Sequence, residues 1–82
     1  MKEWIEEGYP EALKVDGYDD CIVGVCHRFG QKTIIIYDTK MILRKLINND
    51  GMTIDEALEY FEYNILGAWH GDSTPCFLER EP

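Results

Sequence analysis

The stretches CIVGVCHR at residues 21–28 and TIIIY at residues 33–37 decide the fold. Both are rich in β-branched residues and are flanked by turn residues, a composition typical of β-strands. Because only the short segment 29–32 separates them, we predict that they pair as an antiparallel β-hairpin. The run from Ile34 to Ile36 is apolar on both of its faces, so the second strand is predicted to be central, with cover on both sides.

Helical periodicity follows the hairpin. Asp38 or Thr39 is predicted to cap a helix over 40–49, and Gly51 or a neighbouring Asn is predicted to end it. Its buried stripe is expected to contain Ile42, Leu43, Leu46 and Ile47.

A second helix is predicted to begin at Thr53, which forms a capping box with Glu56, and to end at Gly67. Its buried stripe is expected to contain Ile54, Ala57, Leu58, Phe61 and Ile65. A loop then leads to a short third strand at 76–79. The sequence therefore predicts an α+β fold: a three-stranded antiparallel sheet, or a four-stranded one if the N-terminal arm adds a strand, with two helices packed on one face.

The chain has 82 residues, which is one domain. We divide it into an N-terminal arm, residues 1–16, and an α+β core, residues 17–82. Gly8, Pro10 and Gly17 interrupt the arm, so it is expected to be a short helix or an extended segment packed on the domain by Trp4. With 45% hydrophobic residues, the domain is expected to fold without metal or disulfide.

The charge is strongly acidic, with 16 Asp and Glu against 8 Lys and Arg, a net −8. Duplex DNA and anionic membranes repel such a surface, so we predict neither nucleic acid nor membrane as a partner. The N-terminal stretch does not resemble a signal peptide, and three cysteines without framework spacing fit a reducing compartment. We expect a cytoplasmic protein.

The candidate metal ligands and thiol–imidazole pairs of the sequence are Cys21, Cys26, His27, His70 and Cys76. Alternation along a strand points Cys21 and Cys26 to opposite faces, and likewise Cys26 and His27, so they cannot share a zinc site. Neither a glycine-rich nucleophile turn nor a helix N-terminus lies beside a cysteine. The sequence predicts no metal, no cofactor and no enzyme.

The string DGMTIDEALEYFEYNILGAWHGDSTP from Asp50 onward, together with GYDD at 17–20, resembles a family of small uncharacterised proteins encoded mainly by bacteriophages and prophages. The resemblance covers residues 17–79. Cys21 departs from it, standing where a small alanine is usual, and His70 fills a variable slot. The resemblance implies a phage setting and no mechanism. The matching residues are Asp19, Gly24, Gly51, Glu56, Ala57, Phe61, Asn64, Gly67, Trp69, Gly71, Thr74 and Pro75.

The candidate binding residues lie at the end of the second helix and in the loop after it. They are Tyr60, Tyr63, Asn64, Trp69, His70, Asp72 and Thr74. An exposed Trp or Tyr among polar side chains is typical of an interface or a ligand site. The structural alternative stays open: Asn64 and Thr74 would then satisfy loop backbone, and Trp69 would close the core.

We therefore predict a non-enzymatic, acidic binding protein, a phage-type accessory or anti-defence inhibitor that occludes a host protein with a basic surface. The alternative is an oligomeric module that sequesters a nucleotide-type small molecule under the Trp69 loop. Open sheet edges leave room for self-association in either case.

Overall fold

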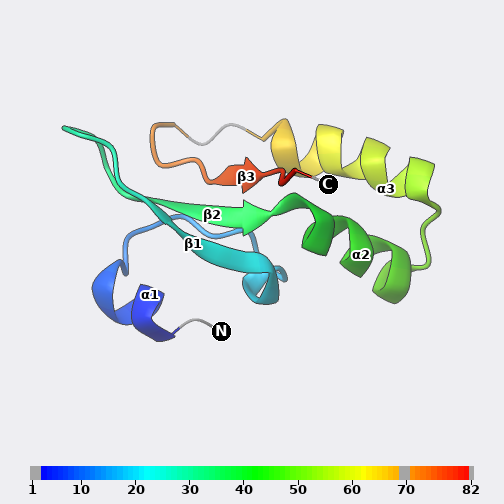
Figure 1. Ribbon diagram of the computed structural model, residues 1–82, viewed down its shortest axis with the longest axis horizontal. Coiled ribbons are helices and arrows are strands. Elements are labelled where there is room, and N and C mark those ends of the chain that lie inside the picture. The colour runs from blue at the N-terminus through cyan, green and yellow to red at the C-terminus, as the bar shows by residue number, and fades with distance from the viewer. Residues whose placement is uncertain (1–2, 69–70, 82) are drawn as a thin grey trace.

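The predicted hairpin is present in the computed structural model, which describes residues 3–68 and 71–81 of the chain. The fold is α+β, with a three-stranded sheet and helices (Figure 1). In chain order the elements are α1 (Glu3–Gly8), the 3-10 turn η1 (Asp19–Cys21), β1 (Ile22–Cys26), β2 (Ile34–Asp38), α2 (Thr39–Asp50), α3 (Ile54–Tyr60), the π-helical turn η2 (Phe61–Leu66) and β3 (Cys76–Leu78).

The sheet is mixed, which corrects the prediction of an antiparallel sheet. Strand β2 is central and pairs antiparallel with β1 on one side and parallel with β3 on the other. The connection explains this direction. Helix α2 carries the chain away from the end of β2 and α3 brings it back (Figure 1). Strand β3 then runs in the same direction as β2, with Cys76 beside Ile36, the middle residue of β2. The described part of the N-terminal arm contains helix α1 and no strand.

Both helix starts follow from the sequence. The Asp38 carboxylate accepts a hydrogen bond from the Met41 amide at 3.0 Å and so caps α2, which ends at Gly51 with a φ of 69°. The capping box of α3 is complete: the Thr53 hydroxyl accepts from the Glu56 amide at 3.2 Å, and the Glu56 carboxylate accepts from the Thr53 amide at 2.9 Å. These caps hold α2 and α3 as the antiparallel pair that determines the course of β3.

The register divides the strand residues between two faces of the sheet. It shifts between Ile22 and Gly24, so Val23 is the extra residue of a β-bulge. Alternation from the paired residues then places every second side chain on each side. We call one side the packed face, formed by Ile22, Val25, Ile35, Tyr37 and Phe77, and the other the open face, formed by Gly24, Cys26, Ile34, Ile36 and Cys76.

The hydrophobic core lies against the packed face. Ile35 and Tyr37 are 0% exposed there, and the Tyr37 ring stacks on Phe77 with ring centroids 5.8 Å apart. The helices complete the same cluster with Ile5, Ile42, Leu46, Ala57, Phe61 and Ile65. The N-terminal arm belongs to it as well, because the Val15 amide donates a 2.7 Å hydrogen bond to the Tyr37 hydroxyl.

The prediction that β2 is covered on both sides holds on the open face at Ile34, which is buried, and less fully at Ile36 and over the neighbouring strand β1. A Cβ built on Gly24 would meet nothing within 4 Å, so the space above this residue is open. Ile34 is 6% exposed but does not belong to the core cluster, and Ile36 is half-buried. Near this end of the sheet, Arg28 donates to the Asp72 carbonyl at 3.1 Å and so links the end of β1 to the segment before β3.

Only part of the predicted stripe of the second helix is buried. Ala57, Phe61 and Ile65 lie in the core, whereas Ile54 and Leu58 are 54% and 41% exposed, contrary to the prediction. Helix α3 lies at the edge of a small domain, so a single line of side chains four residues apart suffices to bury its contact surface (Figure 1). Exposed apolar side chains are therefore left on the outer side of this helix.

Candidate functional site

The described site residues lie on one stretch of the fold. Tyr60 ends α3, Tyr63 and Asn64 lie in η2, and Asp72 and Thr74 lie in the segment that leads to β3. The predicted Trp69 and His70 lie outside the described residues. Asn64 and Thr74 are brought together, because both line the same pocket.

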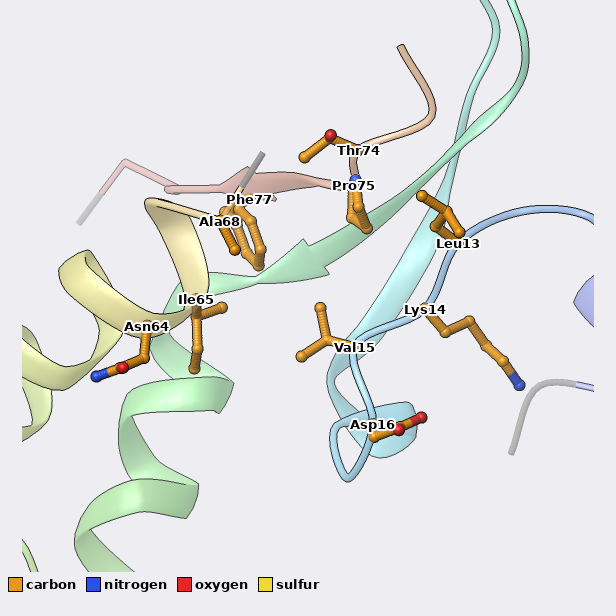
Figure 2. A pocket seen from close by; sticks show the side chains of 10 residues that line it. All are labelled: Leu13, Lys14, Val15, Asp16, Asn64, Ile65, Ala68, Thr74, Pro75 and Phe77. Atoms are coloured by element: carbon orange, nitrogen blue, oxygen red, sulfur yellow. The ribbon is translucent and has the colours of Figure 1, made fainter. Parts of the chain in front are cut away.

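The pocket opens between the N-terminal arm, η2 and the segment before β3 (Figure 2). Its volume is about 570 Å³. Such a volume is within the size range of binding sites for small molecules or for a large side chain of a partner. The lining residues are Leu13, Lys14, Val15, Asp16, Asn64, Ile65, Ala68, Thr74, Pro75 and Phe77.

The inner surface of the pocket is apolar. In Figure 2 the charged tips of Lys14 and Asp16 and the amide of Asn64 point away from the space enclosed by Val15 and Phe77. The Lys14 ammonium and the Asn64 amide already have partners within the chain. The pocket therefore offers mainly carbon to an occupant, and burial of apolar surface would be the main source of affinity.

Three hydrogen bonds or ion pairs hold the polar lining side chains outward. The Lys14 ammonium lies 3.5 Å from the Glu6 carboxylate. The Asn64 amide donates to the Tyr60 carbonyl at 3.3 Å, and the Thr74 hydroxyl donates to the Gly71 carbonyl at 2.7 Å. The polar atoms of Asn64 and Thr74 thus bond to backbone carbonyls, as the structural alternative expects. Both residues also line the pocket.

The arm residues of this pocket were missed by the sequence analysis. Leu13 and Val15 are placed there because the Val15 amide donates to the Tyr37 hydroxyl, which reaches the arm from the central strand. Burial raises the pKa of Tyr37, so its hydroxyl stays protonated in the pH range where the protein is expected to work. The alternation of Leu13 and Val15 between Pro10 and Gly17 was the available signal for an extended, half-buried segment.

A second surface adjoins the pocket. We call it the tyrosine surface, a hollow lined by Met52, Glu56, Glu59, Tyr60, Tyr63 and Asn64. Tyr60 is 40% exposed and Tyr63 is 77% exposed. Asn64 lines both the pocket and the tyrosine surface, so the two adjoin each other at this residue. Together they form the candidate site.

The π-helical turn η2 positions the side chains of Tyr63 and Asn64. Its wide turn is closed by the Gly67 amide, which donates to the Glu62 carbonyl five residues earlier at 2.9 Å. A Cβ on Gly67 would lie 2.8 Å from that same carbonyl oxygen, so the position has no room for a side chain. Gly67 ends the helix as predicted, and the close approach of two backbone segments is the reason for the glycine.

The cysteines and His27 lie apart from the candidate site. Cys21 is buried in the core, where burial raises the pKa of its thiol to about 11, while Cys26 and Cys76 belong to the open face. His27 Nδ1 lies 3.1 Å from the Thr33 hydroxyl, and its ring lies 5.8 Å from the Tyr9 ring. Within residues 3–68 and 71–81, no three His, Cys, Asp or Glu side chains converge in a way that could hold a metal ion.

Comparison of the chain with known protein families, curated proteins and solved structures gives no match. Among the helices that the structure describes, none has the length and apolar character needed to cross a bilayer.

Proposed function

We propose that this protein is a non-enzymatic binding module that docks on a partner protein and occludes it. The observation that carries the proposal is the apolar pocket beside exposed tyrosines (Figure 2). Pockets that receive an apolar anchor, next to Tyr side chains that exclude water, are typical of the centres of protein interfaces. In this reading the pocket receives a large apolar side chain of the partner.

The charge distribution favours a partner with a basic surface. Residues 46–79, which include α3 and η2, contain seven acidic residues and neither Lys nor Arg. The negative electrostatic field of these residues speeds association with a basic surface and repels partners with an acidic surface. A phage-type accessory or anti-defence inhibitor acting on a host protein in the cytoplasm is the setting that fits these properties and the resemblance of the sequence.

The size of the pocket also keeps a small-molecule function as a second candidate. A volume of about 570 Å³ would accommodate a small ligand. A nucleotide-type ligand, however, needs donors for its phosphates, and the polar tips of the lining residues point outward. The acidic surroundings would also repel the phosphates. The apolar lining suits an uncharged apolar ligand better than a nucleotide-type one.

The test compares two substitutions of equally exposed apolar residues. Leu13, on the rim of the pocket, and Met41, on α2 and outside the pocket, are both 38% exposed. Each is replaced by Glu, which adds the same charge. Tagged wild type and both variants are used to capture proteins from bacterial lysate, and the bound proteins are identified by mass spectrometry.

The proposal expects one stoichiometric protein that is retained by the wild type and by Met41→Glu and is lost with Leu13→Glu. Its association rate with the purified wild type should fall steeply as salt is raised, because steering by charge is screened. Equal retention by both variants, or a co-purified small molecule with no protein, would contradict the proposal. Native mass spectrometry of the purified protein detects the second outcome.

A further inference from the structure

Helix α3 and the turn η2 leave several apolar side chains exposed to solvent. They carry five of the large hydrophobic residues that are at least 36% exposed: Ile54, Leu58, Tyr60, Tyr63 and Leu66. Apolar side chains gathered on one exposed helix are a mark of an interaction surface. Of these five residues, Tyr60 and Tyr63 belong to the tyrosine surface, which adjoins the pocket at Asn64.

The two tyrosines of this surface are neighbours on the helix. Tyr60 and Tyr63 are three residues apart, a spacing that places side chains side by side on a helix. Tyr63, at 77% exposure, presents most of its ring to solvent. An exposed ring face of tyrosine attracts a cation that lies within about 6 Å of it.

The carboxylates of the same hollow have no basic partner in the described chain. Glu56 and Glu59 line it, and neither takes part in the three ion pairs of the described residues. The Glu56 carboxylate accepts a hydrogen bond from the Thr53 amide, which is an uncharged donor. Lys45, on the neighbouring helix α2, is bound to Asp20 at 2.9 Å and lies over the Tyr18 ring. The hollow thus combines two aromatic rings with uncompensated negative charge.

We propose that the tyrosine surface binds a lysine or arginine side chain of the partner, next to the apolar side chain that enters the pocket. This inference rests on the proposed function. Because Asn64 borders both hollows, the two side chains belong to one short segment of the partner. The occupant is therefore a basic segment that carries an apolar residue beside a Lys or Arg. A guanidinium suits the site well, since it stacks on tyrosine and bonds to carboxylates with its edge.

The probe is the dipeptide N-acetyl-leucyl-arginine amide, titrated into the full chain and followed by NMR. Its matched control is N-acetyl-leucyl-citrulline amide, which has nearly the same shape and no charge. The arginine peptide should shift the ring signals of Tyr60 and Tyr63 and the side-chain amide of Asn64. It should bind about tenfold more tightly than the citrulline peptide, as expected for a cation on aromatic and acidic groups.

Three variants locate the effect. Tyr63→Ala should weaken the arginine peptide about fivefold, and Glu59→Gln about threefold, with little effect on the citrulline peptide. Glu62→Gln is the matched control for Glu59, because it removes the same charge from the same helix outside the hollow. It should change the dissociation constant by less than twofold. Spermidine, a free cation, should not compete at equal concentration, because the proposed occupant is a segment anchored by its leucine.

Equal binding of the arginine and citrulline peptides, or equal effects of Glu59→Gln and Glu62→Gln, would overturn this inference. So would displacement of the peptide by spermidine. If the captured partner is lost with Leu13→Glu but binds Tyr63→Ala and Glu59→Gln as tightly as wild type, the proposed function stands and the basic side chain is not its determinant. If Leu13→Glu captures the same proteins as wild type, the proposed function itself is wrong.

Discussion

The two faces of the sheet differ although they are built from alternate residues of the same strands. On the packed face, Ile35 and Tyr37 are fully buried under helices and the N-terminal arm. On the open face, Ile36 and Cys76 are half-buried and the space above Gly24 is free. A run of apolar strand residues therefore shows that both sides are shielded from water to some extent, but it does not show that a second layer of structure covers both.

The largest difference should appear when adjacent isoleucines of β2 are truncated. Ile35→Ala removes a 0% exposed side chain from the core and is expected to cost about 3 kcal/mol in the free energy of unfolding, from lost burial and the cavity left behind. Ile36→Ala, on the open face, should cost about 1 kcal/mol, because its side chain keeps part of its contact with water. Denaturant unfolding of both variants measures the two values. Equal costs would show that the open face is covered.

The buried cysteine and the cysteines of the open face should react with a thiol reagent at different rates. Burial raises the pKa of Cys21 from 9.0 to about 11, which lowers its thiolate fraction near pH 8 about 100-fold. Cys26 and Cys76 lie on the open face, and burial raises the pKa of Cys76 as well. Labelling by a disulfide reagent should therefore be fastest at Cys26 and at least 100-fold slower at Cys21.

Single-cysteine variants followed by mass spectrometry resolve the three rates, and labelling in denaturant, where the three rates should agree within a few fold, is the control. Labelling of Cys21 in the native protein at the rate of Cys26 would mean that the packed face opens readily.

Two glycines provide the next comparison. Gly67→Ala forces a methyl group to within 2.8 Å of the Glu62 carbonyl oxygen and should cost about 2 kcal/mol, because η2, which supplies Phe61 and Ile65 to the core, must shift. Gly24→Ala places its methyl group in open space on the other side of the sheet. It should leave stability unchanged or raise it by about 0.5 kcal/mol, since alanine restricts the unfolded chain. Thermal unfolding of the two variants tests both signs, and destabilisation by Gly24→Ala would contradict an open face.

Local signals explain how much of this fold could be predicted. The caps at Asp38 and Thr53 and the β-branched run at 34–36 depend on residues close in sequence, and these elements were predicted close to their observed places. The direction of β3 was predicted wrongly because it depends on how α2 and α3 together return the chain, and no short window of sequence contains that information.

The candidate site was predictable only in part for the same reason. Asn64 and Thr74 stood out as polar residues near a helix end, and the structure brings both to one pocket. Leu13 and Val15 reach that pocket through a hydrogen bond between residues 22 positions apart, from Val15 to Tyr37. The bulge at Val23, which determines the side on which Ile22 lies, has no clear signal in a strand made mostly of β-branched residues.

The smallest expected effect concerns Asp38, the last residue of β2, on the same side of the sheet as Ile36. The Arg80 guanidinium bonds its carboxylate at 2.8 Å and holds the pKa of Asp38 below its ordinary value, and the Met41 amide adds to this. A carboxyl group whose pKa is lower in the folded than in the unfolded chain stabilises the fold above its unfolded pKa of about 3.9, and this contribution is lost as the pH falls through the folded value. Arg80→Gln should therefore lower the free energy of unfolding by about 0.5 kcal/mol at pH 7, a small amount because Arg80 is more than half exposed to solvent.

The difference between wild type and Arg80→Gln should shrink as the pH falls below the unfolded pKa of about 3.9. It should vanish once the pH lies below the lowered pKa of Asp38 in the folded wild type. Unfolding by urea between pH 3 and pH 7 measures it at each pH. Subtracting the variant from the wild type removes the titration of the other carboxylates, which both chains share. A difference that is the same at every pH would mean that Arg80 stabilises the end of the open face by covering Asp38 with its aliphatic stem and not by its charge.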